Sequence, residues 1–166
     1  NMRITHYTLM DSPIGELLLA GDNQGLSLIA FAEKNKTHNI ESHWLQSDTH
    51  FTEAVKQLEQ YFNGQRQSFS ISTHMVGTKF QMKVIKELTQ IPYGKTCSYA
   101  ELAVRVGHPR AYRAVGSANG KNPLWIIIPC HRVIGSDGSL TGYAGGIWRK
   151  KWLLAHENPL KQQSLF

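Results

Sequence analysis

The chain has 166 residues, of which 41% are hydrophobic, and a formal net charge of +6 at pH 7. The length allows one large domain or two small ones, and no run approaches the ~18 apolar residues of a membrane-spanning helix. The start of the chain has no apolar run typical of a signal peptide. With only Cys97 and Cys130 as cysteines, we expect a reducing, cytoplasmic setting and no zinc-finger type of metal site.

Charge is distributed unevenly along the chain. Residues 1–75 contain five Lys or Arg and eight Asp or Glu, a net of −3, whereas residues 76–166 contain thirteen and four, a net of +9. A basic half is typical of domains that bind nucleic acids, although basic surfaces also serve solubility alone. Because the basic residues are interleaved with the motifs described below, nucleic acid is the better interpretation. We expect two domains, 1–75 and 76–166.

The acidic half predicts a small α+β unit. Apolar or alternating runs predict strands at residues 3–10, 16–20 and 26–32, with one more near Phe69 and Ile71. Residues 22–25 have the composition of a hairpin turn. The polar stretch 35–50 predicts a loop with a short helix near Glu41, and residues 52–62 predict an amphipathic helix.

The basic half predicts helices in succession. They are expected at residues 79–90, 99–106 and 110–119, begun by Thr78, Ser98 and His108-Pro109 respectively. Gly107 ends the second helix, so the second and third form a helix-turn-helix pattern. Arg110 and Arg113 at the start of the third helix oppose its dipole, which contact with phosphates or bases would explain. A three-helix core with a solvated basic end is the alternative.

A run of β-branched residues at 126–128 leads to Pro129 and then to Cys130, His131 and Arg132. The run predicts a strand buried on both faces, which Pro129 ends. A thiol beside an imidazole favours nucleophilic chemistry, because the thiolate is the reactive form. In a continuing strand the two side chains would point to opposite faces, so a turn after Pro129 or a bridging water is needed to couple them. An inert buried cysteine is the alternative.

Three further segments surround this run. Asn122 precedes a proline, and its amide can hold a turn or donate to a neighbour. Residues 136–139 predict a tight turn like the wing of a winged helix. Residues 141–146 form a Gly-rich loop with one aromatic residue, suited to a flat ligand but without the spacing of a phosphate-binding loop.

A last helix is predicted at residues 148–156, with basic residues at 149–151. Glu157 lies at its end, where the helix dipole disfavours a carboxylate that has no partner. We expect His131 to be that partner.

Several of these motifs, in this order and spacing, resemble the O6-alkylguanine-DNA alkyltransferases. They are Ser98-Tyr99-Ala100-Glu101-Leu102-Ala103, Arg113-Ala114-Val115-Gly116, Asn122-Pro123, the stretch 126–135 with its Pro-Cys-His-Arg-Val core, Gly142-Tyr143-Ala144-Gly145-Gly146, and residues 151–157. The match covers nearly all of residues 78–157 and is looser in the first half. The Pro-Cys-His-Arg-Val core is highly specific to that family.

The resemblance implies an α+β fold, with a small ribonuclease H-like α/β domain followed by a mainly helical, winged-helix-like domain that contains the helix-turn-helix. It implies direct-reversal DNA repair: an irreversible, one-turnover transfer of the alkyl group from O6-alkylguanine, and less efficiently from O4-alkylthymine, to a cysteine. The expected partner is double-stranded DNA, bound in the minor groove with the base flipped out. No cofactor, metal or membrane is expected. A monomer is expected, and cooperative loading on DNA is left open.

The same resemblance implies the catalytic roles. Cys130 would be the nucleophile, His131 would take its proton through a water, and Glu157 would orient and stabilise the imidazolium. Asn122 would hold the turn that links the recognition helix to the cysteine.

It also implies how substrate and DNA are bound. Tyr99 would donate to the guanine ring nitrogen and push the target phosphate, and Arg113 would fill the gap in the base stack. The backbone of Cys130 and of the loop at Tyr143, Ala144 and Gly145 would contact the base, the amide of Ala144 serving where some members have a Ser hydroxyl. The residues expected to contact DNA are Tyr99, Ala100, Arg110, Arg113 and Ser136.

Three other classes of protein share part of the pattern. An alkyltransferase-like protein that binds lesions without repairing them lacks the nucleophile, so Cys130 argues against it. A winged-helix transcription factor would explain Arg110 and Arg113 but neither the Pro-Cys-His-Arg motif nor Glu157. A cysteine hydrolase would leave the DNA-binding half without a use.

Overall fold

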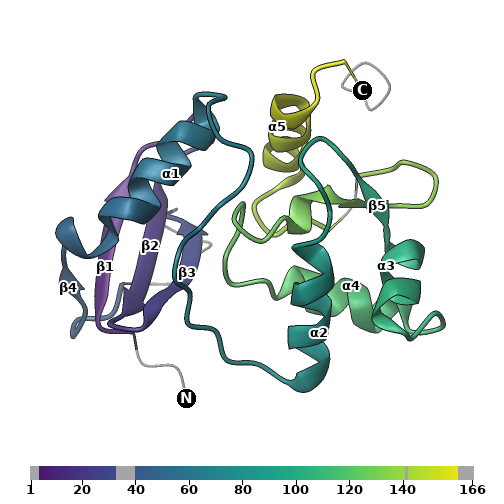
Figure 1. The fold of residues 1–166 in the computed structure, drawn as a ribbon, viewed down its shortest axis with the longest axis horizontal. Coiled ribbons are helices and arrows are strands. Elements are labelled where there is room, and N and C mark those ends of the chain that lie inside the picture. The colour runs from purple at the N-terminus through teal and green to yellow at the C-terminus, as the bar shows by residue number, and fades with distance from the viewer. Residues whose placement is uncertain (1–3, 33–39, 141, 161–166) are drawn as a thin grey trace. The chain divides into compact units, whose positions relative to one another are not determined.

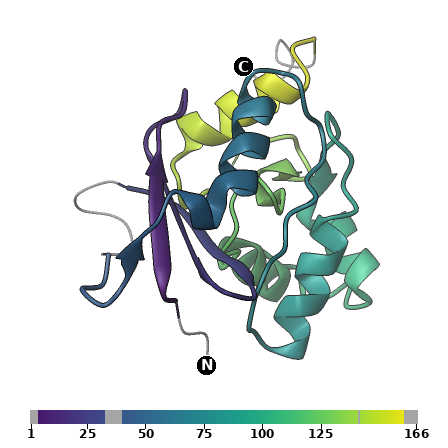
Figure 2. The ribbon, with the colours of Figure 1, turned by 60° about the vertical axis from the view of Figure 1, so that its left-hand side comes forward.

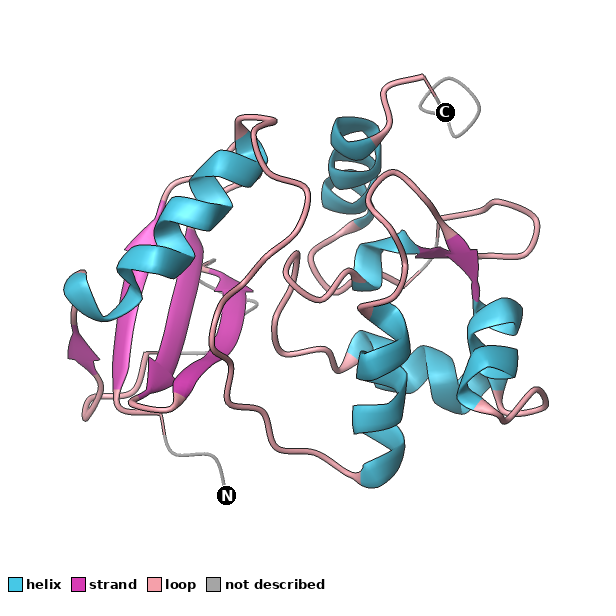
Figure 3. Ribbon diagram, viewed as in Figure 1, coloured by secondary structure: helices cyan, strands magenta, loops and turns pink. Residues whose placement is uncertain are grey.

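The computed structural model describes residues 4–32, 40–140 and 142–160, and the chain divides into two compact units, Asn1–Val76 and Gly77–Phe166 (Figure 1). Strands gather in the first unit, whereas the second consists mainly of helices (Figure 3). Within the described ranges, no helix combines the length and the hydropathy needed to cross a bilayer.

The first unit is built on a mixed four-stranded sheet. Its strands are β1 (His6–Met10), β2 (Leu17–Asp22), β3 (Gly25–Phe31) and β4 (Leu45–Gln46), in the order β3-β2-β1-β4. The first three strands form an antiparallel meander, and β4 pairs with β1 in parallel. The predicted hairpin turn is confirmed, because the Asp22 carboxylate accepts hydrogen bonds from the backbone amides of Gln24 (2.8 Å) and Gly25 (3.3 Å).

Both faces of the sheet are covered. Successive side chains of a strand point to opposite faces, and Leu17, Leu18, Leu19 and Ala20 are all buried. One face carries a cluster of Leu18, Ala20, Leu28, Ala30 and Trp44. The helix α1 (Thr52–Phe62), at the predicted position, runs across a face of the sheet in both views (Figures 1 and 2).

Two predicted elements of this unit are wrong. Phe69 and Ile71 lie in no strand; only Thr73 makes an isolated bridge, to Leu26 at the start of β3. Phe69 is instead held by its ring, whose centroid lies 5.6 Å from that of Tyr61. The chain at Glu41 leads into a turn rather than a helix, and the part of that prediction on residues 35–39 lies outside the described residues.

The first two helices of the second unit begin where their caps predict, and the first of them ends two residues before its predicted end at residue 90. They are α2 (Lys79–Leu88) and α3 (Tyr99–Val106), and both start with complete capping boxes, Thr78 with Gln81 and Ser98 with Glu101. Gly107 ends α3 in the left-handed conformation, with φ of 87°. The helix α4 (Tyr112–Gly120) follows, and α2, α3 and α4 pack against one another, so the helix-turn-helix is confirmed.

One boundary in this region differs from the prediction. Arg110 precedes α4 instead of opening it, because the amide of Ala111 bonds to the carbonyl of His108 at 2.9 Å and closes a separate turn. Arg113 remains in the first turn of the helix.

The predicted strand at residues 126–128 is wrong. The chain turns at Ile126, whose φ is +76°, and Trp125 and Ile128 form a single bridge to each other. The reason is Asn122: its Oδ1 accepts from the amide of Leu124 (3.0 Å) and its Nδ2 donates to the carbonyl of Ile128 (2.8 Å). The amide thus satisfies the backbone groups that a neighbouring strand would otherwise bond.

The rest of the unit leads from this turn to the last helix. A 3₁₀ turn, η2 (Cys130–Arg132), is followed by β6 (Val133–Ile134), which pairs in parallel with β5 (Cys97–Ser98). The predicted tight turn at 136–139 is present, closed by the amide of Gly135 bonding to the carbonyl of Ser139 at 2.9 Å. The helix α5 (Ile147–Glu157) ends the described fold.

Candidate active site

Cys130 lies at the first position of the 3₁₀ turn that follows Pro129. Its backbone amide donates to the carbonyl of Ile128 at 2.8 Å, and the amide of Arg132 donates to the carbonyl of Pro129 at 3.0 Å. The chain therefore turns at the point where the sequence required a turn if the thiol and the imidazole were to be coupled. Cys130 is 4% exposed and His131 is fully buried.

Glu157 is the partner of His131, as expected. The Nε2 atom of His131 lies 2.8 Å from Oε2 of Glu157, and both side chains are buried. A carboxylate only accepts hydrogen bonds, so Nε2 carries the proton and Nδ1 of the neutral ring is the nitrogen with the free lone pair. Nδ1 is buried and has no hydrogen-bond partner among the described residues. The imidazole is therefore held in the tautomer of a base.

Arg132 is a third member of this group, which the sequence analysis did not assign. Its Nε and Nη2 donate to Oε1 and Oε2 of Glu157 at 2.7 and 3.0 Å, and its Nη1 donates to the carbonyl of Ile91 at 2.7 Å. Burial raises the pKa of Glu157, but the hydrogen bonds from His131 and Arg132 and the charge of Arg132 outweigh it and hold that pKa well below its usual range. Glu157 is thus a fixed anion beneath the imidazole.

The Cys130 thiol is protonated at rest. Burial raises its pKa to about 11, against the opposing effects of a hydrogen bond from the Asn122 side chain and the positive charge of Lys150. Nucleophilic attack near neutral pH therefore requires a base to take the proton, and His131 is the adjacent residue.

Lys150 on α5 is a second residue that the sequence analysis missed. The sequence shows it as one of three consecutive basic residues, and in the structure it is fully buried. Burial lowers its pKa to about 8. Helical periodicity could have found it, because Lys150 lies on the same face as Leu153, Leu154 and Glu157.

Two of the residues expected to contact the base lie near this group, Tyr99 at the start of α3 and Tyr143 in the loop at 142–146. The ring centroid of Tyr99 lies 5.9 Å from Nζ of Lys150, and a side chain at Gly116 of α4 would lie 3.7 Å from the same ring. The ring of Tyr143 lies 5.8 Å from that of Trp125, and its buried hydroxyl has no partner among the described residues.

The loop at 142–146 is tied to α5. The guanidinium of Arg149, also buried, donates to the carbonyl of Gly145 at 3.0 Å. Ala144, next to it, is exposed. Burial and the nearby charge of Cys130 raise the pKa of Tyr143 well above its ordinary value, so its hydroxyl remains a donor.

The residues expected to contact DNA lie on the surface of the second unit. Ala100, Arg110, Arg113 and Ser136 are exposed, and Tyr99 is half-buried. The first four belong to the start of α3, the turn before α4, the first turn of α4 and the turn at 136–139.

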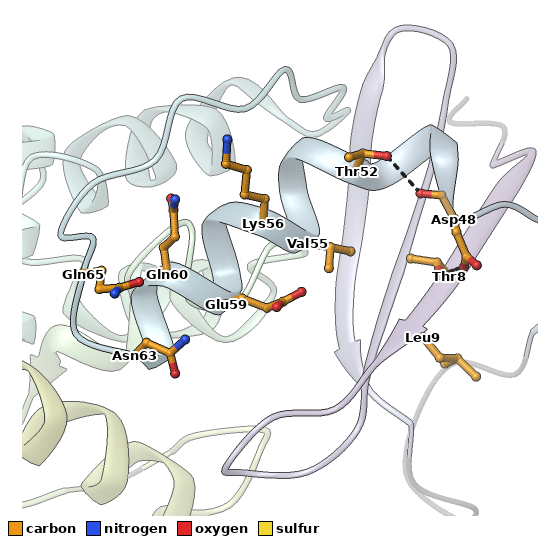
Figure 4. A pocket seen from close by; sticks show the side chains of 10 residues that line it. All are labelled: Thr8, Leu9, Asp48, Thr52, Val55, Lys56, Glu59, Gln60, Asn63 and Gln65. Atoms are coloured by element: carbon orange, nitrogen blue, oxygen red, sulfur yellow. Dashed lines mark hydrogen bonds between the residues drawn. The ribbon is translucent and has the colours of Figure 1, made fainter.

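A groove of about 530 Å³ in the first unit is a weaker candidate (Figure 4). It lies between α1 and β1, and its walls carry hydroxyl, amide and charged side chains, among them Asp48, Thr52, Lys56 and Glu59 (Figure 4). No cysteine or histidine lines it. Among the described residues, no group of three or more His, Cys, Asp or Glu side chains is placed to hold a metal ion.

Comparison with known proteins assigns both units to one family. Residues 5–75 match the ribonuclease-like domain of the 6-O-methylguanine DNA methyltransferases, and residues 79–159 match their DNA-binding domain. A relative from Methanosarcina barkeri named methylated-DNA–protein-cysteine methyltransferase is 51% identical over 94% of this chain and 99% of its own length.

Solved structures agree with this assignment. The crystal structure of the Mycobacterium tuberculosis O6-methylguanine methyltransferase is 48% identical, covers 93% of each chain and has a TM-score of 0.85. A structure of the M. tuberculosis protein in complex with DNA has the same TM-score, at 46% identity over 97% of this chain and 94% of the other. On both domains and nearly its whole length, the chain belongs to the 6-O-methylguanine DNA methyltransferase family.

Proposed function

We propose that this protein repairs alkylated DNA by direct reversal. It transfers the alkyl group of O6-alkylguanine, and less efficiently that of O4-alkylthymine, to its own Cys130 in a single irreversible turnover. The observation that carries the proposal is the buried Cys130 thiol on a tight turn, next to an imidazole that Glu157 holds as a base. The names of the relatives and the DNA complex of one of them support the same reaction.

The proposed chemistry begins with proton transfer. The Cys130 thiol passes its proton through a water molecule to Nδ1 of His131, and Glu157 stabilises the imidazolium. The thiolate then attacks the alkyl carbon, the bond between that carbon and O6 breaks, and the electron pair goes to the guanine. Tyr99 donates a hydrogen bond to the ring nitrogen and offsets the developing charge. The imidazolium returns the proton through the water to the guanine, so neutral, unmodified guanine is restored and Cys130 remains as a thioether with no leaving group.

The proposed DNA contacts come from the helix-turn-helix. Four residues face the duplex in the minor groove: Ala100, Arg110, Arg113 and Ser136. The net charge of +9 on residues 76–166 favours the binding of a polyanion such as DNA. Arg113 fills the place of the flipped nucleotide, since a guanidinium both stacks on bases and donates hydrogen bonds. Tyr99 also pushes the phosphate of the target nucleotide.

The proposed base pocket is closed by the loop at 142–146. The backbone at Tyr143, Ala144 and Gly145 contacts the flipped base, and Asn122 holds the turn that positions Cys130. Residues 76–166 carry the chemistry, and residues 1–75 support them. We place the protein in the cytoplasm, a reducing compartment that its free thiols, Cys97 and Cys130, favour. We also propose that it is a monomer.

The test is the intact mass of the protein after mixing with a duplex that contains one O6-methylguanine, followed by peptide mapping. We expect a gain of one methyl group per chain, confined to the peptide with Cys130. Cys130→Ser abolishes the gain, whereas the matched control Cys97→Ser, at the other buried thiol, keeps it. Lesion-selective binding without any mass gain would make the protein a damage sensor and would disprove the transfer reaction.

A further inference from the structure

Asn119, near the end of α4, carries a buried amide that is only half satisfied. The residue is 3% exposed, and its Nδ2 lies 3.4 Å from the backbone carbonyl of Cys130. Because a carbonyl only accepts, the nitrogen must face Cys130 and the oxygen must face away from it. That oxygen, Oδ1, is buried and has no hydrogen-bond partner among the described residues. A buried acceptor without a hydrogen-bond partner lowers the stability of the fold, so a functional reason for it is expected.

The position of Asn119 on α4 indicates that use. Gly116 lies three residues earlier, and residues at this spacing share a helix face. This face meets the ring of Tyr99 at Gly116 and the backbone of Cys130 at Asn119. The Asn119 amide therefore lies on the face of α4 that meets both Tyr99, which is proposed to donate to the guanine ring, and Cys130, which is proposed to attack the alkyl carbon.

The chemistry of guanine fits this arrangement. The ring nitrogen on its minor-groove edge is bonded to the carbon that carries the exocyclic 2-amino group. That group has two N–H donors. The Cys130 carbonyl already accepts from the side chain of Asn119 and from the backbone amide of Val133, so Oδ1 of Asn119 is the acceptor that is left for one of these donors.

We propose that Asn119 is a specificity-determining residue whose Oδ1 accepts a hydrogen bond from the 2-amino group of the alkylated guanine. The inference rests on the proposed function. Alkylated bases without this amino group, such as O6-methylhypoxanthine and O4-methylthymine, leave Oδ1 unpaired and react more slowly.

The experiment compares single-turnover methyl transfer from two duplexes that differ only in O6-methylguanine or O6-methylhypoxanthine. We expect the wild type to prefer guanine by about tenfold or more, the effect of one hydrogen bond in a buried site. Asn119→Leu, which has a similar shape but no acceptor, lowers this preference by about tenfold because only the guanine rate falls. The free-energy cost of flipping each base is a property of the duplex and is the same for both proteins. It therefore cancels when the preference of the variant is compared with that of the wild type.

Ser117→Ala, at an exposed position of the same helix, is the matched control and keeps the wild-type preference. Asn119→Ala is the second variant, and melting temperatures establish that each variant is folded. Equal rates on the two duplexes in the wild type, or an equal fall on both in the Asn119 variants, would overturn the inference, the latter by assigning Asn119 a structural role. Absence of transfer from either duplex by the wild type would instead overturn the proposed function.

Discussion

Arg132 holds both oxygens of the Glu157 carboxylate, with Nε 2.7 Å from Oε1 and Nη2 3.0 Å from Oε2. His131 bonds to the second of these oxygens at 2.8 Å. The carboxylate that orients the imidazole is thus itself fixed by a fork of two donors, which restricts both its position and its charge state.

Arg132→Met should uncouple this arrangement. Removing one partner of a buried ion pair leaves an uncompensated charge and typically costs about 3–5 kcal/mol of unfolding free energy. We expect a loss of that order at pH 7, measured by urea denaturation, together with slower methyl transfer. Arg66→Met, in the first unit, serves as the control and leaves the transfer rate unchanged.

The same variant should change the dependence of stability on acid. The pKa of Glu157 is lower in the folded chain than its ordinary value of 4.5, so the unfolded chain binds more protons as the pH falls below that value. The stability that Glu157 contributes is present above about pH 4.5 and is lost toward lower pH. In Arg132→Met the folded-state pKa of Glu157 rises toward its ordinary value, so this part of the acid loss becomes smaller. An unchanged acid profile would show that Arg132 does not set the charge of Glu157.

Lys150→Met should slow the reaction of Cys130 at pH values where the lysine is charged. Burial raises the pKa of the thiol, and the charge that Lys150 carries below its own pKa of about 8 opposes that effect. Without the lysine, the rate of Cys130 alkylation by a small-molecule alkylating agent should fall below about pH 8 and should match the wild-type rate at higher pH. Lys151→Met, at the exposed neighbouring position, leaves the profile unchanged.

Lys150 also makes a prediction about stability. Its pKa is about 8 in the folded chain and 10.5 ordinarily, so between these values the unfolded chain binds more protons. Stability therefore rises with pH over this interval through Lys150. Unfolding free energies at pH 7.5 and 9.5 should show this contribution in the wild type and its absence in Lys150→Met. The same pH response in both proteins would contradict the assigned pKa.

Asn122→Asp should weaken the turn before Cys130. The carboxylate keeps the acceptor for the amide of Leu124 but loses the donor to the carbonyl of Ile128. A buried carbonyl left unpaired costs about 1–3 kcal/mol, which thermal unfolding measures. The pKa of Cys130 should also rise, because the hydrogen bond from Asn122 lowers it. Asn63→Asp, at an exposed position after α1, is the control.

Arg113→Ala should separate base flipping from chemistry. If Arg113 replaces the flipped nucleotide in the stack, the variant slows repair of duplex DNA far more than transfer from free O6-benzylguanine, which needs no flipping. Single-turnover rates on both substrates measure this. Arg105→Ala, at an exposed position of α3, should affect neither. Equal losses on the two substrates for Arg113→Ala would rule out the flipping role.

The elements that the sequence predicted correctly depend on neighbouring residues. The capping boxes at Thr78 and Ser98 and the left-handed Gly107 join groups within a few positions along the chain, so their pattern is visible in the sequence. The pairing of His131 with Glu157 was also foreseen, because a carboxylate at the end of a helix needs a partner.

What the sequence could not show depends on contacts between distant segments. A run of β-branched residues reads as a buried strand, yet at 126–128 the chain turns because the amide of Asn122 takes over the backbone hydrogen bonds. The sequence shows Lys150 only as one of three consecutive basic residues, but α5 buries it near Cys130. Local sequence thus determined the helices, whereas tertiary packing decided which charges lie near Cys130, since burial and pairing are set by residues far apart in the chain.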